Sequence, residues 1–249
     1  MRWRTMVLGL LAVVGAIPAA RGAEAGWFPF VLPWDDDSRT AVHVGALLPT
    51  PAGGDGFLQA RDGHLVDGKG RRVRLLGVNF VFGANFPNKP DAAKLAARMR
   101  KFGINIVRLH HMDFYHAPRG IFDPAYRDNQ HLDKEQLDRL DYLVHQLKEH
   151  GIYVNVNLHV SRHLNAADGF PDTDGLPRLG KAVSYYEPRM IELQKKYAKD
   201  LLDRVNPYTK TRYTEEPAVA VIELTNEDTL FGEAWEAPCP RCRARTAPS

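Results

Sequence analysis

Residues 217–230 read PAVAVIELTNEDTL, an apolar run that ends in an asparagine and a glutamate. The run from Ala218 to Leu224 is rich in β-branched and apolar residues, which predicts a buried strand. Asn226 and Glu227 follow it directly. In parallel α/β folds, ligands bind at the carboxyl ends of the strands, so Glu227 is a candidate acid catalyst.

Three earlier runs have the same strand-like composition, and three segments between the runs repeat apolar residues at helical spacing. The predicted strands cover about residues 73–80, 104–112, 152–160 and 218–224, and the predicted helices about 90–103, 133–151 and 187–205. Strands that alternate with helices predict an α/β fold with a parallel sheet and right-handed crossovers. An open doubly wound sheet and a (β/α)-barrel both fit, and a complete barrel needs eight strands. No glycine-rich phosphate loop follows the first strand, which argues against nucleotide binding.

The segments before the first strand are predicted to be a leader, a lead-in and a hairpin. Residues 1–25 combine early arginines, an apolar run and small residues, which is typical of a secretory signal peptide; a membrane anchor is the alternative. Residues 26–55 are rich in proline, glycine and aspartate and predict an extended lead-in. Residues 56–80 contain glycine turns at 62–63 and 67–70 that predict a β-hairpin. We therefore expect a secreted or periplasmic protein with no membrane partner once the leader is removed.

Charge and cysteine usage argue against several classes of protein. The whole chain has a formal net charge of +3, and removal of the leader brings it closer to zero. This gives no electrostatic reason to expect nucleic acid or an anionic membrane as a partner. Cys239 and Cys242 form a lone C-x-x-C, whereas a structural zinc site needs about four ligands. Residues 236–249 resemble neither a helix nor a strand, and we expect an unstructured tail there.

Polar side chains occur at the carboxyl ends of all four predicted strands, which is stronger evidence for a site than any single motif. They are Asn79 on the first strand, Arg108, His110 and His111 on the second, His159 on the third, and Asn226 with Glu227 on the fourth. Each also has a purely structural interpretation. The histidines can be buried and bonded to backbone, and Arg108 can form an ion pair with Glu223 inside the mouth of the sheet.

The strand ends resemble a known family. The stretches GVNF, NIVRLHHM, NVNLHV and VIELTNE are similar to the first four strand ends of family 5 cellulase-type glycoside hydrolases, which belong to the retaining (β/α)8-barrel clan. The stretch GHLVDGKGRRVRLLGVN resembles their lead-in hairpin, which covers the bottom of the barrel. The resemblance extends over about Gly56 to Trp235. It implies a partial (β/α)8 TIM barrel over 56–235, an oligo- or polysaccharide substrate and no cofactor.

The resemblance also implies roles for individual residues. Glu227 matches the general acid/base, and Asn226 matches the residue that holds the sugar 2-hydroxyl. Arg108 matches the arginine that supports the nucleophile, and His159 matches a histidine lining the substrate subsite. A retaining enzyme uses one carboxyl group to protonate the leaving oxygen and a second one, about 5–5.5 Å away, as nucleophile.

Further residues near the strand ends are implied as sugar contacts or are candidates for stacking. His110, His111 and Asn79 lie where sites of this family contact sugar. Aromatic side chains that either stack on sugar rings or pack in the core are Phe80, Phe82, Phe86, Phe114, Tyr115 and Trp235.

The second carboxylate is not recognisable in this sequence. In the family the nucleophile is a glutamate at the end of strand seven, whereas the predicted strands number four. We therefore expect a truncated gene product, or a reading frame that changes near Trp235, with little or no glycosidase activity. Two open barrel edges would favour self-association.

Two other classes of function stay open. A carbohydrate-binding or vestigial half barrel would use the same mouth without chemistry. A metal-dependent barrel hydrolase would use histidines as ligands, and its candidate set is His110, His111, His116, His159 and His163.

Overall fold

The computed structural model describes residues 31–229 except 161, 171–172, 174–179 and 182. The chain divides into two units, residues 1–33 and 34–249, and the fold described below belongs to the second. The predicted leader over 1–25 and the predicted tail over 236–249 lie outside the described residues. Among the described residues, no helix combines the length and the apolar character needed to span a bilayer.

Four parallel strands form the central sheet, in the order β3-β4-β5-β6. They are β3 (Gly77–Val81), β4 (Ile106–His110), β5 (Tyr153–His159) and β6 (Val219–Thr225). The connecting helices are α1 (Lys89–Lys101), α2 (Lys134–Glu149) and α3 (Pro188–Leu202). Each strand pairs with the one before it in sequence, which is the arrangement of consecutive β/α units in a barrel. The prediction of a partial (β/α)8 barrel is confirmed.

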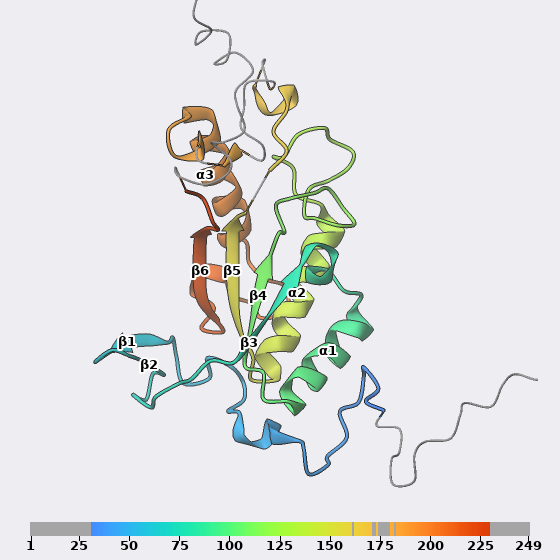
Figure 1. Cartoon of the computed structure of the whole chain (residues 1–249), viewed down its shortest axis with the longest axis vertical. Helices are drawn as coiled ribbons and strands as arrows, with labels where there is room; N and C mark the ends of the chain where they lie inside the picture. The colour runs from blue at the N-terminus through green and yellow to red at the C-terminus, as the bar shows by residue number, and fades with distance from the viewer. Residues whose placement is uncertain (1–30, 161, 171–172, 174–179, 182, 230–249) are drawn as a thin grey trace, which may run out of the picture. The chain divides into compact units, whose positions relative to one another are not determined.

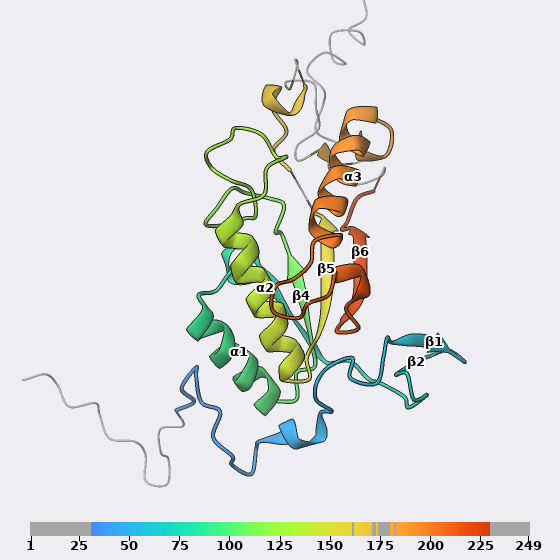
Figure 2. The ribbon, with the colours of Figure 1, turned by 180° about the vertical axis from the view of Figure 1, so that it is seen from behind.

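The three helices cover the same face of the sheet. Figure 1 looks onto the opposite, uncovered face, and Figure 2 shows the helices in front of the strands. Alternate residues of the two central strands point toward the helices and are almost fully buried: Val107 and Leu109 from β4, and Val154, Val156 and Leu158 from β5. They pack into one apolar core with Ala96 and Met99 of α1 and with Leu140, Leu143 and Leu147 of α2.

Side-chain caps explain where the helices begin. Asn88 Oδ1 accepts from the Asp91 N–H at 2.9 Å, and Asp133 Oδ1 accepts from the Gln136 N–H at 2.8 Å. Both bonds satisfy an amide that has no partner within the helix. The predicted glycine stops are also present, since Gly103 and Gly151 follow α1 and α2 with φ of +77° and +75°.

The Gln136 side chain does not complete a capping box with Asp133. The spacing of the two residues would allow a reciprocal box, in which the Gln136 side chain returns to the cap. The Gln136 amide instead donates to the carbonyls of Pro118 and Gly120, at 3.1 and 3.0 Å. These two loop carbonyls need donors, and satisfying them outweighs a local bond at the helix start.

The predicted hairpin is present but shorter than expected. Strands β1 (Gln59–Arg61) and β2 (His64–Val66) pair antiparallel around the turn at Asp62-Gly63, whose φ values are +50° and +74°. The predicted strand over 73–80 begins only at Gly77. The chain before it is held by the second turn, where Asp67 Oδ1 accepts from the Lys69 and Arg71 N–H groups at 3.0 and 2.9 Å.

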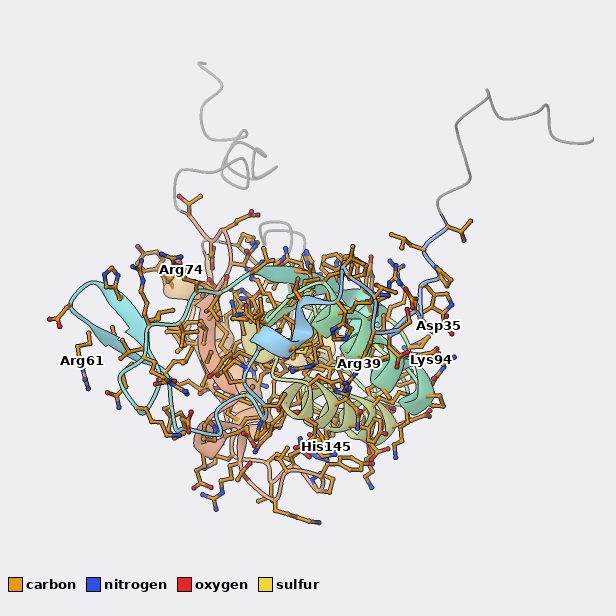
Figure 3. All side chains as sticks on the ribbon, turned by 90° about the horizontal axis from the view of Figure 1, so that it is seen from below. Asp35, Arg39, Arg61, Arg74, Lys94 and His145 are labelled. Carbon is orange, nitrogen blue, oxygen red and sulfur yellow. The ribbon has the colours of Figure 1, made fainter. Side chains whose placement is uncertain are left out.

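The lead-in is ordered against α1. It contains a 3-10 helix, η1 (Val44–Leu47), that the composition did not predict. Lys101 of α1 is completely buried and pairs with Asp36, and its Nζ also donates to Ser38 Oγ at 3.2 Å. Asp35 and Lys94 form a second, exposed pair at 3.3 Å, seen from below the sheet in Figure 3.

Candidate active site

Strand register gathers the polar residues on the uncovered face of the sheet. Asn79 pairs with Arg108, and Arg108 pairs with Asn155 across β3, β4 and β5. Further along, Asn157 pairs with Glu223 and His159 pairs with Thr225. Paired residues of parallel strands point to the same side, and alternate residues point to opposite sides. The sequence of β5, YVNVNLH, therefore puts its asparagines and His159 on one face and its apolar residues on the other.

An ion pair crosses this face between β4 and β6. Arg108 Nε donates to Glu223 Oε2 at 2.7 Å, and Arg108 Nη2 donates to Glu223 Oε1. Asn155 Nδ2 reaches the same carboxylate at 3.4 Å. The hydrogen bond from Arg108 lowers the pKa of Glu223, so this carboxylate is ionised. The predicted Arg108–Glu223 pair is confirmed.

Arg108 also reaches the end of β6. Its Nη2 donates to Asn226 Oδ1 at 2.8 Å, and the Asn226 N–H donates to the carbonyl of His159 at 2.8 Å. Lys181 Nζ donates to the Asn226 carbonyl at 2.5 Å. Asn226 is thus fixed through its side chain, its N–H and its carbonyl.

Glu227 follows in a left-handed backbone conformation, with φ of +47°. Its side chain is exposed, and its carboxylate has no hydrogen-bond or ion-pair partner among the described residues. A positive φ is uncommon for a residue with a side chain and is found most often where function requires it. Phe82 after β3 and His111 after β4 share this conformation, with φ of +51° and +56°. Backbone strain therefore collects at the carboxyl ends of three strands.

A buried carboxylate lies beneath His159. Asp113 is fully buried, and its Oδ2 lies 3.3 Å from His159 Nδ1 and 3.5 Å from Arg162 Nε. Asp113 also accepts from the Val160 N–H at 3.1 Å. Burial by itself raises the pKa of Asp113, but His159, Arg162 and this N–H outweigh it and lower the pKa below its usual value. His159 Nε2 is buried and has no hydrogen-bond partner among the residues that the structure describes.

The two adjacent histidines of β4 differ in their surroundings. His110 is buried, and its Nδ1 lies 2.8 Å from Asn157 Oδ1. Burial lowers the pKa of His110 below 6.5, against the effect of the Asn157 bond. His111 stacks on Phe82 with ring centroids 4.6 Å apart. Burial, followed by the neighbouring His110, lowers the pKa of His111 as well. Both rings are therefore neutral near pH 7.

The predicted aromatic candidates separate into two groups. Phe82, Phe114 and Tyr115 form one half-buried cluster with His111, and His163 joins it at 4.9 Å from Phe114. This cluster lies beside the ends of β3 and β4 and can offer ring faces to a ligand. For Phe80 and Phe86 the structure supports packing, the second of the two interpretations.

Phe80 and Phe86 belong to the interior. Phe80 alternates with Asn79 along β3 and so points toward the helices, where it packs against the core. Phe86 is buried within the core itself. Trp235 lies outside the described residues.

The proposed metal ligands do not converge. Within the described part of the chain, no three or more His, Cys, Asp or Glu side chains are arranged to hold a metal ion. His110 and His159 are engaged with Asn157 and Asp113, and His116 Nε2 lies 2.9 Å from the Asp128 carbonyl. Cys239 and Cys242 lie outside the described residues.

Three residues that sequence reasoning missed support the site. Asp113 and Arg162 lie in loops, where no periodicity reports burial, and Lys181 lies in the long loop before α3. Asn155 and Asn157 were detectable, since they alternate with valines in β5 and share the parity of His159.

A cavity elsewhere in the fold does not compete with this site. A cavity of 340 Å³ at the amino ends of the strands is lined by Asp55, Arg71, Asn105 and Tyr153, among others. Arg71 and Lys69 already pair there with Asp55. Parallel sheets bind ligands at their carboxyl ends, so we read this cavity as structural.

Comparisons with known proteins agree with the fold. The family model described as Cellulase (glycosyl hydrolase family 5) matches residues 66–241. No curated protein sequence matches the chain. An endo-1,4-beta-mannanase from Rhizomucor miehei is similar in structure, with a TM-score of 0.52, 17% identity, and coverage of 69% of this chain and 48% of its own.

Two further solved structures come from the same organism. A glycoside hydrolase family 5 mannosidase has a TM-score of 0.54 and 15% identity. The match covers 72% of this chain and 50% of the mannosidase. A mutant of such a mannosidase in complex with mannosyl-fructose has a TM-score of 0.56, with the same identity and coverage. At these identities the likeness concerns the fold alone. The chain spans about half the length of each of these three structures.

Proposed function

The chain belongs to glycosyl hydrolase family 5, and from this premise we propose that the uncovered sheet face binds an oligo- or polysaccharide for O-glycosidic bond cleavage. Asn226 carries the proposal, because Arg108, His159 and Lys181 hold it at a strand end beside Glu227. Such a fixed polar group is what a substrate-binding site requires.

Glu227 is the proposed general acid/base. A glycosidic oxygen is a poor leaving group, and a carboxyl group must protonate it as the bond breaks. The carboxylate of Glu227 forms no competing hydrogen bond with a described residue and is exposed on the ligand side. The same residue then activates the water that releases the sugar from the nucleophile in a retaining mechanism.

The neighbouring residues have proposed roles around Glu227. Arg108 uses Nε and Nη2 on Glu223 and Asn226, which leaves Nη1 to donate to a nucleophilic carboxylate. His159 Nε2 is a buried polar atom for which the described part of the chain supplies no partner, so a sugar hydroxyl there would satisfy it. His110, His111 and Asn79 complete the polar surface, and the cluster around Phe82 offers ring faces for stacking.

We propose that a polypeptide of these 249 residues binds sugar but turns it over slowly or not at all, because the nucleophile of this family follows strand seven and the described sheet has four parallel strands. A non-catalytic binding protein is the second candidate on the same observation. Purified protein incubated with β-mannan or β-glucan tests both. Release of reducing ends that Glu227→Gln abolishes, and Glu215→Gln does not, would establish catalysis and overturn the proposed inactivity.

Binding without turnover has its own measurement. Affinity electrophoresis in β-mannan or β-glucan gels should retard the wild type, and Asn226→Ala should remove the retardation. Equal mobility in gels with and without polysaccharide would contradict a role in sugar recognition.

Secretion and self-association are further proposals. The leader-like sequence of residues 1–25 supports export, and amino-terminal sequencing of exported protein would locate the cleavage point. Strands β3 and β6 lie at the edges of the described sheet and expose Val81 (40%) and Leu224 (71%). Unpaired edges with apolar residues favour association, which light scattering measures as a mass above that of the monomer.

A further inference from the structure

Glu223 holds the guanidinium of Arg108 in one plane. Two donors of Arg108 meet the two oxygens of one carboxylate, and Asn155 Nδ2 reaches that carboxylate from β5 at 3.4 Å. A two-point bond of this kind fixes the direction of a guanidinium as well as its position. Arg108 and Glu223 are 22% and 25% exposed, so neither is free to move widely.

The fixed plane determines which atom of Asn226 faces Arg108. Arg108 Nη2 lies 2.8 Å from Asn226 Oδ1. A guanidinium only donates, so the oxygen of the amide has to face it and the nitrogen has to face away. The backbone of Asn226 is anchored independently by the carbonyl of His159 and by Lys181, so the side-chain amide is the remaining variable.

The amide nitrogen is left as a donor on the ligand side. Asn226 Nδ2 has no acceptor among the described residues, while Oδ1 is occupied. The site therefore offers a donor, and it selects a ligand atom that accepts. If the amide could rotate by half a turn, it would offer an acceptor instead and lose that selectivity.

We infer that Glu223 is a positioning residue, which acts through Arg108 to lock the Asn226 amide with its nitrogen toward an acceptor oxygen at C2 of the bound sugar. The identity of the ligand atom rests on the proposed function. The lock itself rests on the four bonds that join Asn155, Glu223, Arg108 and Asn226.

Nuclear magnetic resonance of the uniformly ¹⁵N-labelled chain tests the lock without any sugar. The Arg108 Nε–H and Asn226 Nδ2 signals are assigned with Arg108→Lys and Asn226→Asp. Glu223→Gln replaces one acceptor oxygen with an amide NH2 group, a donor that faces the donors of the guanidinium. We expect Glu223→Gln to shift the Arg108 Nε–H and Asn226 Nδ2 signals. We also expect faster exchange of the Arg108 Nε–H with water.

Matched variants separate positioning from general damage. Glu215→Gln makes the same chemical change at an exposed glutamate of the η6 turn (Tyr213–Glu215) and should leave both signals in place. Glu223→Asp keeps two acceptor oxygens on a shorter arm and should restore them in part. Glu223→Ala removes both acceptor oxygens and replaces Glu223→Gln if that variant does not fold. Unchanged Asn226 side-chain signals in a folded Glu223→Gln or Glu223→Ala would overturn the inference.

A selectivity measurement tests the consequence for binding. Mannobiose and cellobiose are each compared with their 2-deoxy analogues by calorimetry. One hydrogen bond predicts a preference of about three- to tenfold for the 2-hydroxyl compound in the wild type and in Glu215→Gln. Glu223→Gln and Asn226→Ala should both reduce it to about one. A preference retained in Glu223→Gln would overturn the inference.

The two experiments fail in different ways. If the wild type binds neither sugar, the proposed function is contradicted, and the resonance measurement alone decides whether Glu223 locks the amide. If sugar binds with the expected preference but Glu223→Gln changes nothing, the function stands and the positioning role is wrong.

Discussion

The two faces of the sheet are built by opposite rules from the same strands. On the helix side, Leu109 and its neighbours are apolar, fully buried and without strain. On the uncovered side, Arg108 and His159 carry charge or unsatisfied polar atoms, and the strand ends adopt left-handed backbone. Stability comes from the first face, and the second gives up some stability to present polar groups. Four predictions test this division.

The largest expected effect lies beneath the polar face. Asp113→Ala leaves His159 and Arg162 buried without their carboxylate, so we expect a loss of about 3–5 kcal/mol in the free energy of unfolding. Urea titration followed by circular dichroism measures it. Asp200→Ala, at an exposed pair on α3, is the control and should change little. If Asp113→Ala lowers the free energy of unfolding as little as the control does, the buried Asp113 carboxylate does not stabilise the polar face.

A core substitution on the opposite face should cost slightly less. Leu109→Ala removes a fully buried side chain and should lower the free energy of unfolding by about 2–5 kcal/mol. Leu224→Ala, at a residue that is 71% exposed on β6, should cost less than about 1 kcal/mol. The same urea titration compares them. Equal losses would mean that the helix side does not dominate stability.

Protonation of His110, on the uncovered face of the sheet, should make the free energy of unfolding depend on pH. Burial holds the pKa of His110 below its unfolded value, so the folded chain resists a proton that the unfolded chain accepts. The contribution of His110 to the free energy of unfolding is therefore fully present above the unfolded pKa of about 6.5. It is lost as the pH falls through the lower folded pKa. His110→Gln should flatten this part of the profile, measured as melting temperature between pH 7.5 and 5. Parallel profiles for both proteins would contradict the assignment.

The smallest expected effect is a gain. Glu227 has φ of +47°, and asparagine tolerates this region better than glutamate. Glu227→Asn should raise the free energy of unfolding by about 0.5–1 kcal/mol. It should also remove any glycosidase activity. Glu215→Asn, at a residue outside the left-handed region, should give no gain, and a destabilised Glu227→Asn would be evidence against stored strain.

Strand parity accounts for most of what the sequence predicted. Residues two apart on a strand share a face, which is why the Arg108–Glu223 pair could be predicted across 115 residues. The same rule decides between the two interpretations of Phe80, because Asn79 and Phe80 are adjacent on β3 and point to opposite faces of the sheet.

Loop residues could not be predicted in this way. Asp113 meets His159 and Arg162 through tertiary packing, and no local pattern marks a loop aspartate as buried. The positive φ of Phe82 and Glu227 is equally invisible, since neither is a residue type that favours left-handed backbone. The partners of the Gln136 side chain could not be predicted for a related reason, since it bonds to the carbonyls of Pro118 and Gly120 and not to the nearby cap.

The sequential order of the strands determines the order in which they can pair during synthesis of the chain. Each strand pairs with its predecessor, so the sheet can grow as the polypeptide leaves the ribosome. Arg108 and Glu223 are separated by 115 residues, which takes roughly 6–23 seconds to synthesise at 5–20 residues per second. Until β6 has been synthesised, Arg108 therefore lacks the Glu223 carboxylate that later fixes its guanidinium.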